Sequence, residues 1–190
     1  MYRIVTYILK MILRVLHKVN IKNGHVIPQK GPFIIACTHT GWVDVLQLGT
    51  SLLPLEIHYM AKKELFNRKL TSILLKKLNA FPVDRDNPGP STLKIPNRLL
   101  ADGKIVGIFP SGTRTDELSS LKQGAIAIAQ RNGVPVIPVI YKGPNNVKEL
   151  LFKREATLIF QEPIVITTKD KKARENFTNV LEERLTKVQY

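Results

Sequence analysis

The sequence predicts one α/β domain with a mainly parallel sheet flanked by helices, and three features of the chain favour this fold class. Short apolar runs with the length and β-branched content of buried strands recur along the chain. Segments with helical periodicity separate these runs, and such alternation is typical of a parallel sheet whose faces are covered by helices. At 190 residues, 44% of them hydrophobic, the chain has the size and composition of a single globular domain.

The N-terminal segment 2–19 predicts a basic amphipathic helix. Charges interrupt its apolar stretch too often for a membrane span, and it lacks the charge-free core of a signal peptide. We therefore expect 1–20 to anchor the protein in the plane of an anionic leaflet, at the cytoplasmic face of the cell membrane, with the main domain at 21–190. The alternative is a helix packed on its own domain with a solvated basic edge. The bases lie on one side of the helix: Arg3, Lys10, Arg14 and Lys18.

The other elements follow in order along the chain. Ser91 is expected to cap one helix and Ser119 or Ser120 the next, because serine side chains accept hydrogen bonds from the first helical N–H groups. Strands are expected at 21–27, 33–38, 56–61, 105–109, 134–140, 157–160 and 164–166, and helices at 42–53, 62–78, 91–101, 121–131 and 171–188.

The stretch 33–44 carries the first chemical signal. The apolar strand ends just before His39, and Asp44 falls in the first turn of the following helix. On a continuous helix, residues five apart point about 140° away from each other, so the two side chains meet only if the chain turns at Gly41. An aspartate bonded to one imidazole nitrogen fixes the tautomer and leaves the other nitrogen free as a base. The alternative is a histidine at the core edge and a helix-capping aspartate.

A second polar loop, 110–115, follows the apolar strand 105–109. Gly112 allows the backbone to approach a ligand closely, and Arg114 can hold a phosphate through two hydrogen bonds. Arg85 and Lys62 lie at two other strand ends and are candidates for the same phosphate site.

Nucleophilic and metal chemistry are poorly supported. Ser111 does not fit a nucleophile elbow, because Phe109 and Thr113 stand where that motif has glycines. Asp84 and Asp86 lack a second carboxylate cluster, so we expect no metal site. A base without a nucleophilic side chain predicts that a hydroxyl of the substrate attacks.

The net charge of +14 indicates an anionic partner, such as a lipid surface, a phosphorylated substrate or an acidic carrier protein. No acidic residue precedes Asp44. Nucleic acid is disfavoured, because aromatic residues make up 7% of the chain and do not interleave with a basic stripe. The single cysteine, Cys37, excludes an internal disulfide and suits a reducing compartment.

Four segments in the stretch 33–140 resemble, in the same order, the motifs of the glycerolipid acyltransferases. His39-Thr-Gly-Trp-Val-Asp44 matches the H-x4-D motif, and Phe109-Pro-Ser-Gly-Thr-Arg-Thr115 resembles F-P-E-G-T-R-S. Phe81-Pro-Val-Asp-Arg85 resembles the intermediate motif that ends in arginine, and Val134-Pro-Val-Ile-Pro138 resembles the fourth, apolar-proline motif. Ser111 replaces the usual glutamate, which removes a negative charge beside the expected phosphate site.

The resemblance implies an acyl transfer without cofactor, metal or covalent acyl-enzyme. His39, oriented by Asp44, would take the proton from the sn-2 hydroxyl of lysophosphatidate as it attacks an acyl thioester of acyl carrier protein or coenzyme A. Arg114, Arg85 and Lys62 would bind the phosphate. The backbone of the loop Ser111, Gly112 and Thr113 would stabilise the oxyanion.

Two alternatives remain open at this point. One is a sibling acyltransferase that uses glycerol 3-phosphate or another lysolipid, because nothing in the loops excludes such acceptors. The other is a non-catalytic basic module that binds membranes, in which His39→Ala would change nothing.

Overall fold

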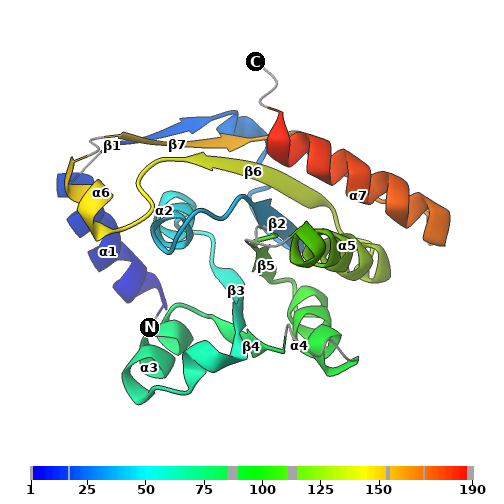
Figure 1. The fold of residues 1–190 in the computed structure, drawn as a ribbon, viewed down its shortest axis with the longest axis horizontal. Helices are drawn as coiled ribbons and strands as arrows, with labels where there is room; N and C mark the ends of the chain where they lie inside the picture. The colour runs from blue at the N-terminus through cyan, green and yellow to red at the C-terminus, as the bar shows by residue number, and fades with distance from the viewer. Residues whose placement is uncertain are drawn as a thin grey trace.

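The centre of the computed structural model is a seven-stranded sheet (Figure 1). The structure describes residues 2–16, 18–84, 90–110, 115–152, 155–168 and 170–187. Within them the strand order is β1-β7-β6-β2-β5-β3-β4. Neighbouring strands are parallel except β6 and β7, which confirms the predicted class. The strands are β1 Lys18–Lys22, β2 Phe33–Cys37, β3 Ile57–Lys62, β4 Phe81–Val83, β5 Ile105–Ile108, β6 Val136–Lys142 and β7 Glu155–Phe160.

Helices cover both faces of the sheet (Figure 1). On one face α4, α5 and α7 pack against the strands, and on the other α2 packs with α3, while α1 and α6 pack against α2. None of the described helices is both long and apolar enough to cross a membrane. The helices are α1 Tyr2–Leu16, α2 Val43–Ser51, α3 Lys69–Lys77, α4 Pro90–Ala101, α5 Thr115–Asn132, α6 Val147–Phe152 and α7 Lys171–Thr186, with short 3-10 turns η1 Gly24–Val26 and η2 Lys63–Phe66.

The central strand β2 is buried over its whole length. Its side chains alternate between the two layers: Phe33, Ile35 and Cys37 face the α2 side, whereas Ile34 and Ala36 face the α5 side. A strand buried on both faces is expected to be continuously apolar, as this one is. Parallel pairing places the C-terminal ends of β2, β3, β4, β5 and β6 at one edge of the sheet, where the polar loops follow.

Two of the predicted helix starts were wrong. Helix α5 begins at Thr115, so Ser119 and Ser120 lie inside it instead of capping it. In the sequence, the acidic residues 116 and 117 favour an earlier start, because negative charge is favourable in the first turn of a helix. Helix α4 begins at Pro90, one residue before the predicted cap, in keeping with the preference of proline for the first helical position.

Three other predicted elements also differ. The helix expected over 62–78 is split into η2 and α3, because Arg68 has an extended backbone. The strand expected at 164–166 is a single bridge between Ile164 and Val136. The first strand begins at Lys18, earlier than expected, because it pairs with β7; the helix predicted over 2–19 therefore ends at Leu16, and Lys18 is not one of its bases. Helix α6 was not predicted.

Candidate active site

His39 lies just beyond the C-terminal end of β2, and pairing with β6 fixes its backbone. The N–H of Thr38 donates to the carbonyl oxygen of Val139 at 3.0 Å. The N–H of Tyr141 in turn donates to the Thr38 hydroxyl at 2.8 Å. These two bonds extend the contact between β2 and β6 beyond the last residue of β2. They hold the backbone immediately before His39 at the edge of the sheet.

Asp44, in the first turn of α2, is fully buried and accepts several hydrogen bonds. Its Oδ2 accepts from the backbone N–H of Thr40 at 2.6 Å and from that of Gly41 at 3.1 Å. The Nδ1 atom of His39 lies 3.1 Å from Oδ1 and 3.2 Å from Oδ2. A buried carboxylate is tolerated only with such partners, and the helix N-terminus adds a favourable field.

This geometry sets the role of each imidazole nitrogen. An ionised carboxylate only accepts hydrogen bonds, so Nδ1 of His39 must be the donor toward Asp44. The proton on Nδ1 leaves Nε2 with a lone pair, which is the state of a general base. The His39 side chain is 34% exposed, whereas that of Asp44 is inaccessible. The predicted meeting of the two side chains is confirmed.

The turn between these residues depends on Gly41. A Cβ atom at this position would lie 2.0 Å from the carbonyl oxygen of Asn145, in the loop after β6. The hydroxyl of Tyr141 donates to the carbonyl of Pro144 at 2.9 Å and fixes the same loop. The sequence does not predict this part of the site, because residues more than 100 positions apart form it and neither Asn145 nor Tyr141 belongs to a recognised motif.

Phe109 brings the second predicted motif to the histidine. It follows β5, which lies next to β2, and its ring is tilted against the His39 ring with 5.2 Å between centroids. The ring of Tyr59 from β3 also lies near Phe109, at 6.0 Å between ring centroids. The predicted oxyanion and phosphate residues Ser111, Gly112, Thr113 and Arg114 lie outside the described residues, two to five positions after this contact.

Of the two remaining candidates for binding the phosphate, the structure describes Lys62 but not Arg85. Lys62 is the last residue of β3, at the same edge of the sheet as His39 but two strands away. Its neighbour Lys63 forms an ion pair with Asp84, just after β4. Arg85, the next residue, lies outside the described residues. Among those that are described, no group of three His, Cys, Asp or Glu side chains could hold a metal ion.

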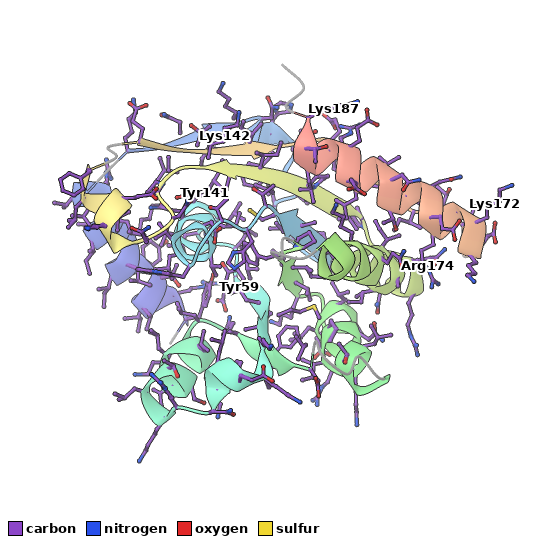
Figure 2. All side chains as sticks on the ribbon, viewed as in Figure 1. Tyr59, Tyr141, Lys142, Lys172, Arg174 and Lys187 are labelled. Atoms are coloured by element: carbon purple, nitrogen blue, oxygen red, sulfur yellow. The ribbon has the colours of Figure 1, made fainter. Side chains whose placement is uncertain are left out.

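Three groups near the pair are unsuited to nucleophilic attack. Cys37 is buried, and burial together with the charge of Asp44 raises the pKa of its thiol well above the ordinary value. Burial and the same carboxylate raise the pKa of Tyr141. Tyr59 is also buried and its pKa is raised well above its ordinary value, chiefly by burial. Tyr59 and Tyr141 (both labelled in Figure 2) come from β3 and β6. The raised pKa values keep Cys37, Tyr59 and Tyr141 protonated, so His39 remains the candidate base.

A general base on a histidine–aspartate pair, at the edge of a mainly parallel sheet, is the arrangement that the motif resemblance implies. Residues 18–142 match the model of the acyltransferase family, so the chain belongs to that family and is an acyltransferase. The predicted recognition is thereby confirmed.

The chain is similar to several proteins of one kind. It is 52% identical over 164 residues to the 1-acyl-sn-glycerol-3-phosphate acyltransferase of Bacillus subtilis, covering 86% of this chain and 82% of the relative. It is 32% identical over 169 residues to the protein of the same name from Streptococcus pneumoniae, covering 85% and 63%. The fold resembles the 1-acyl-sn-glycerophosphate (LPA) acyltransferase PlsC of Thermotoga maritima, with a TM-score of 0.64, 20% identity and coverage of 100% and 83%.

Proposed function

We propose that this acyltransferase transfers an acyl chain from a thioester to the sn-2 hydroxyl of lysophosphatidate, which gives phosphatidate for phospholipid biosynthesis. The observation that carries the proposal is the His39–Asp44 contact at 3.1 Å, with the carboxylate held by two backbone N–H groups. The names of its relatives in Bacillus subtilis and Streptococcus pneumoniae support this choice of acceptor.

In the proposed reaction, Nε2 of His39 removes the proton of the sn-2 hydroxyl while that oxygen attacks the thioester carbonyl. Asp44 stabilises the imidazolium that forms. The tetrahedral intermediate then expels the thiolate, which takes the proton back from His39, so the ester and a free thiol are the products. General-base catalysis of this kind contributes about 10²–10⁴-fold to the rate.

The phosphate would be bound by Arg114, with Arg85 and Lys62 as further ligands, and the backbone around Gly112 would hold the oxyanion. Phe109 supports this placement, because its ring contacts His39. Arg114 follows Phe109 by five positions in the sequence.

Helix α1 would hold the enzyme at an anionic membrane surface. Its side chains Tyr2, Thr6 and Leu13 are buried on the protein, while apolar side chains on the opposite side are exposed, from 50% for Tyr7 to 85% for Val15. Such a stripe next to basic residues is typical of helices that lie in the membrane interface. The stripe, called the α1 apolar stripe below, consists of Ile4, Tyr7, Ile8, Met11, Ile12 and Val15.

The test is acyl transfer by the purified protein, with acyl carrier protein and coenzyme A thioesters as separate donors. Lysophosphatidate, glycerol 3-phosphate and a neutral lysolipid are the acceptors. We expect phosphatidate from lysophosphatidate and a loss of at least ~10²-fold in His39→Ala. His25→Ala, which removes an exposed histidine from η1, is the matched control and should keep full activity.

Each unfavourable outcome has a separate meaning. Preference for glycerol 3-phosphate or the neutral lysolipid would overturn the acceptor and leave the base in place. Full turnover in a folded His39→Ala variant would overturn the mechanism.

A further inference from the structure

A second site lies beside the candidate active site, between α1, α2 and β1. These three elements enclose a cleft of about 390 Å³, within the range of small-molecule sites in proteins. Helix α2 connects the two sites, because Asp44 belongs to the active site and Gln47 and Ser51 line the cleft. Residues three and seven positions apart lie on one side of a helix, so the cleft begins roughly one turn, about 5 Å, beyond Asp44.

Three basic side chains line the cleft: Lys10 and Arg14 from α1 and Lys18 from β1. None of the described lining residues is acidic. Arg3, the other base of α1, is instead paired with Glu56 at 2.7 Å. Three cations converging on one concave surface favour an anion with several oxygen acceptors, such as a phosphate group.

The cleft also has an apolar part, formed by Leu13, Val19 and Ile21. A free inorganic anion has no apolar groups to contact these side chains. An anionic lipid has both a phosphate for the basic residues and methylene groups for the apolar ones. At ~30 Å³ for each water-sized group, the cleft has room for roughly a dozen, enough for a phosphoglycerol head group and the first carbons of its chains.

The position of the cleft relative to the α1 apolar stripe points to the same ligand. On a helix with 100° per residue, Arg14 lies next to the stripe residue Tyr7 around the helix, and Lys10 lies one step further from the stripe. A helix that rests on a bilayer through this stripe therefore carries its basic edge, including the cleft residues Lys10 and Arg14, at the level of the lipid phosphates.

We propose that the cleft between α1, α2 and β1 binds the phosphate head group of an anionic phospholipid, separately from the substrate site at His39. Lys10, Arg14 and Lys18 bind the phosphate, and Leu13, Val19 and Ile21 contact the start of the acyl chains. The inference does not depend on which acceptor the enzyme uses.

The test is isothermal titration of the full chain with dihexanoyl phosphatidylglycerol below its micelle concentration, which separates binding in the cleft from binding to a bilayer. We expect saturable binding of one lipid per chain. Lys10→Gln/Arg14→Gln should raise Kd at least 10-fold. The matched control, Lys69→Gln/Lys76→Gln on the exposed helix α3, removes the same charge and should change Kd by no more than 2-fold.

A second pair of variants changes shape and keeps the charge. Ser51→Phe fills the cleft from α2 and should also raise Kd at least 10-fold, whereas Ser51→Ala should leave it unchanged. Circular dichroism and the melting temperature establish that each variant is folded. Inorganic phosphate should bind at least 10-fold more weakly than the lipid, and dihexanoyl phosphatidylcholine should not saturate.

Four outcomes would overturn the proposal. They are the absence of saturable binding by the wild type, equal weakening by Lys10→Gln/Arg14→Gln and by its control Lys69→Gln/Lys76→Gln, unchanged affinity in Ser51→Phe, and inorganic phosphate binding as tightly as the lipid. The second would show attraction to net charge alone, and the last would show a site for free anions.

Discussion

Asp44→Asn is the substitution that separates the charge of this residue from its shape. The carbonyl oxygen of asparagine can stay in the place of Oδ2, where the N–H groups of Thr40 and Gly41 donate at 2.6 and 3.1 Å. The amide nitrogen then takes the place of Oδ1, 3.1 Å from Nδ1 of His39. An amide N–H donates, so Nδ1 must become the acceptor and the proton moves to Nε2.

This tautomer removes the base without removing the ring. We expect kcat to fall about 10²–10⁴-fold, which corresponds to about 2.7 to 5.4 kcal/mol of activation free energy. Stability should change little, by about 1 kcal/mol or less, because both backbone hydrogen bonds are kept. Asp44→Ala should be much less stable, by about 2 to 6 kcal/mol, since two buried N–H groups lose their acceptor at about 1–3 kcal/mol each.

The assay is steady-state formation of phosphatidate, combined with urea unfolding of both variants. KM for lysophosphatidate should stay within about 3-fold of the wild type, because the substitution leaves the phosphate candidates untouched. A folded Asp44→Asn variant with more than a third of the wild-type kcat would refute the tautomer argument. Equal stability of the two variants would refute the role of the carboxylate as a backbone acceptor.

Three further predictions follow from the geometry. Gly41→Ala should lower the free energy of unfolding by about 1–3 kcal/mol and kcat about 10²-fold, because its Cβ would lie 2.0 Å from the Asn145 carbonyl; normal activity would contradict this. The pKa of Tyr141 is raised by burial, so the folded state keeps a proton that the unfolded state releases above pH ~10, and stability should fall as the pH rises past that value. Urea unfolding at pH 8 and 10.5 should show a smaller fall in Tyr141→Phe, with the exposed Tyr7→Phe as control. Met11→Lys, in the α1 apolar stripe, should weaken binding to anionic vesicles at least 10-fold in a sedimentation assay without unfolding the domain.

Local sequence patterns predicted the contact between His39 and Asp44, because residues close together in the sequence determine it. The apolar run before His39, the glycine after it and the acidic residue in the first helical turn each favour their own conformation, and together they place the base. The start of α5 was predicted too late in the sequence. The acidic residues 116 and 117 favour a start near 115, but Ser119 and Ser120 are also good N-cap residues and were chosen instead.

Long-range contacts explain what the sequence did not predict. The approach of Gly41 to Asn145 depends on how β6 and the loop after it cross the end of β2. The cleft likewise combines α1, α2 and β1, three elements whose relative orientation no periodicity encodes. Strand β7 runs antiparallel to β6, and the six-residue helix α6 between them was not predicted.

The pairing of β1 with β7 has a consequence for the order of events during synthesis. Lys18 lies opposite Glu155 in the register, and the side chain of Asn23 donates to the carbonyl of Phe160 across 137 positions of sequence. At about 5–20 residues per second, β1 leaves the ribosome roughly 7 to 27 s before its partner strand exists. Throughout that interval β1 lacks the strand with which it pairs in the folded domain, so β1 can join the sheet only after β7 has been made.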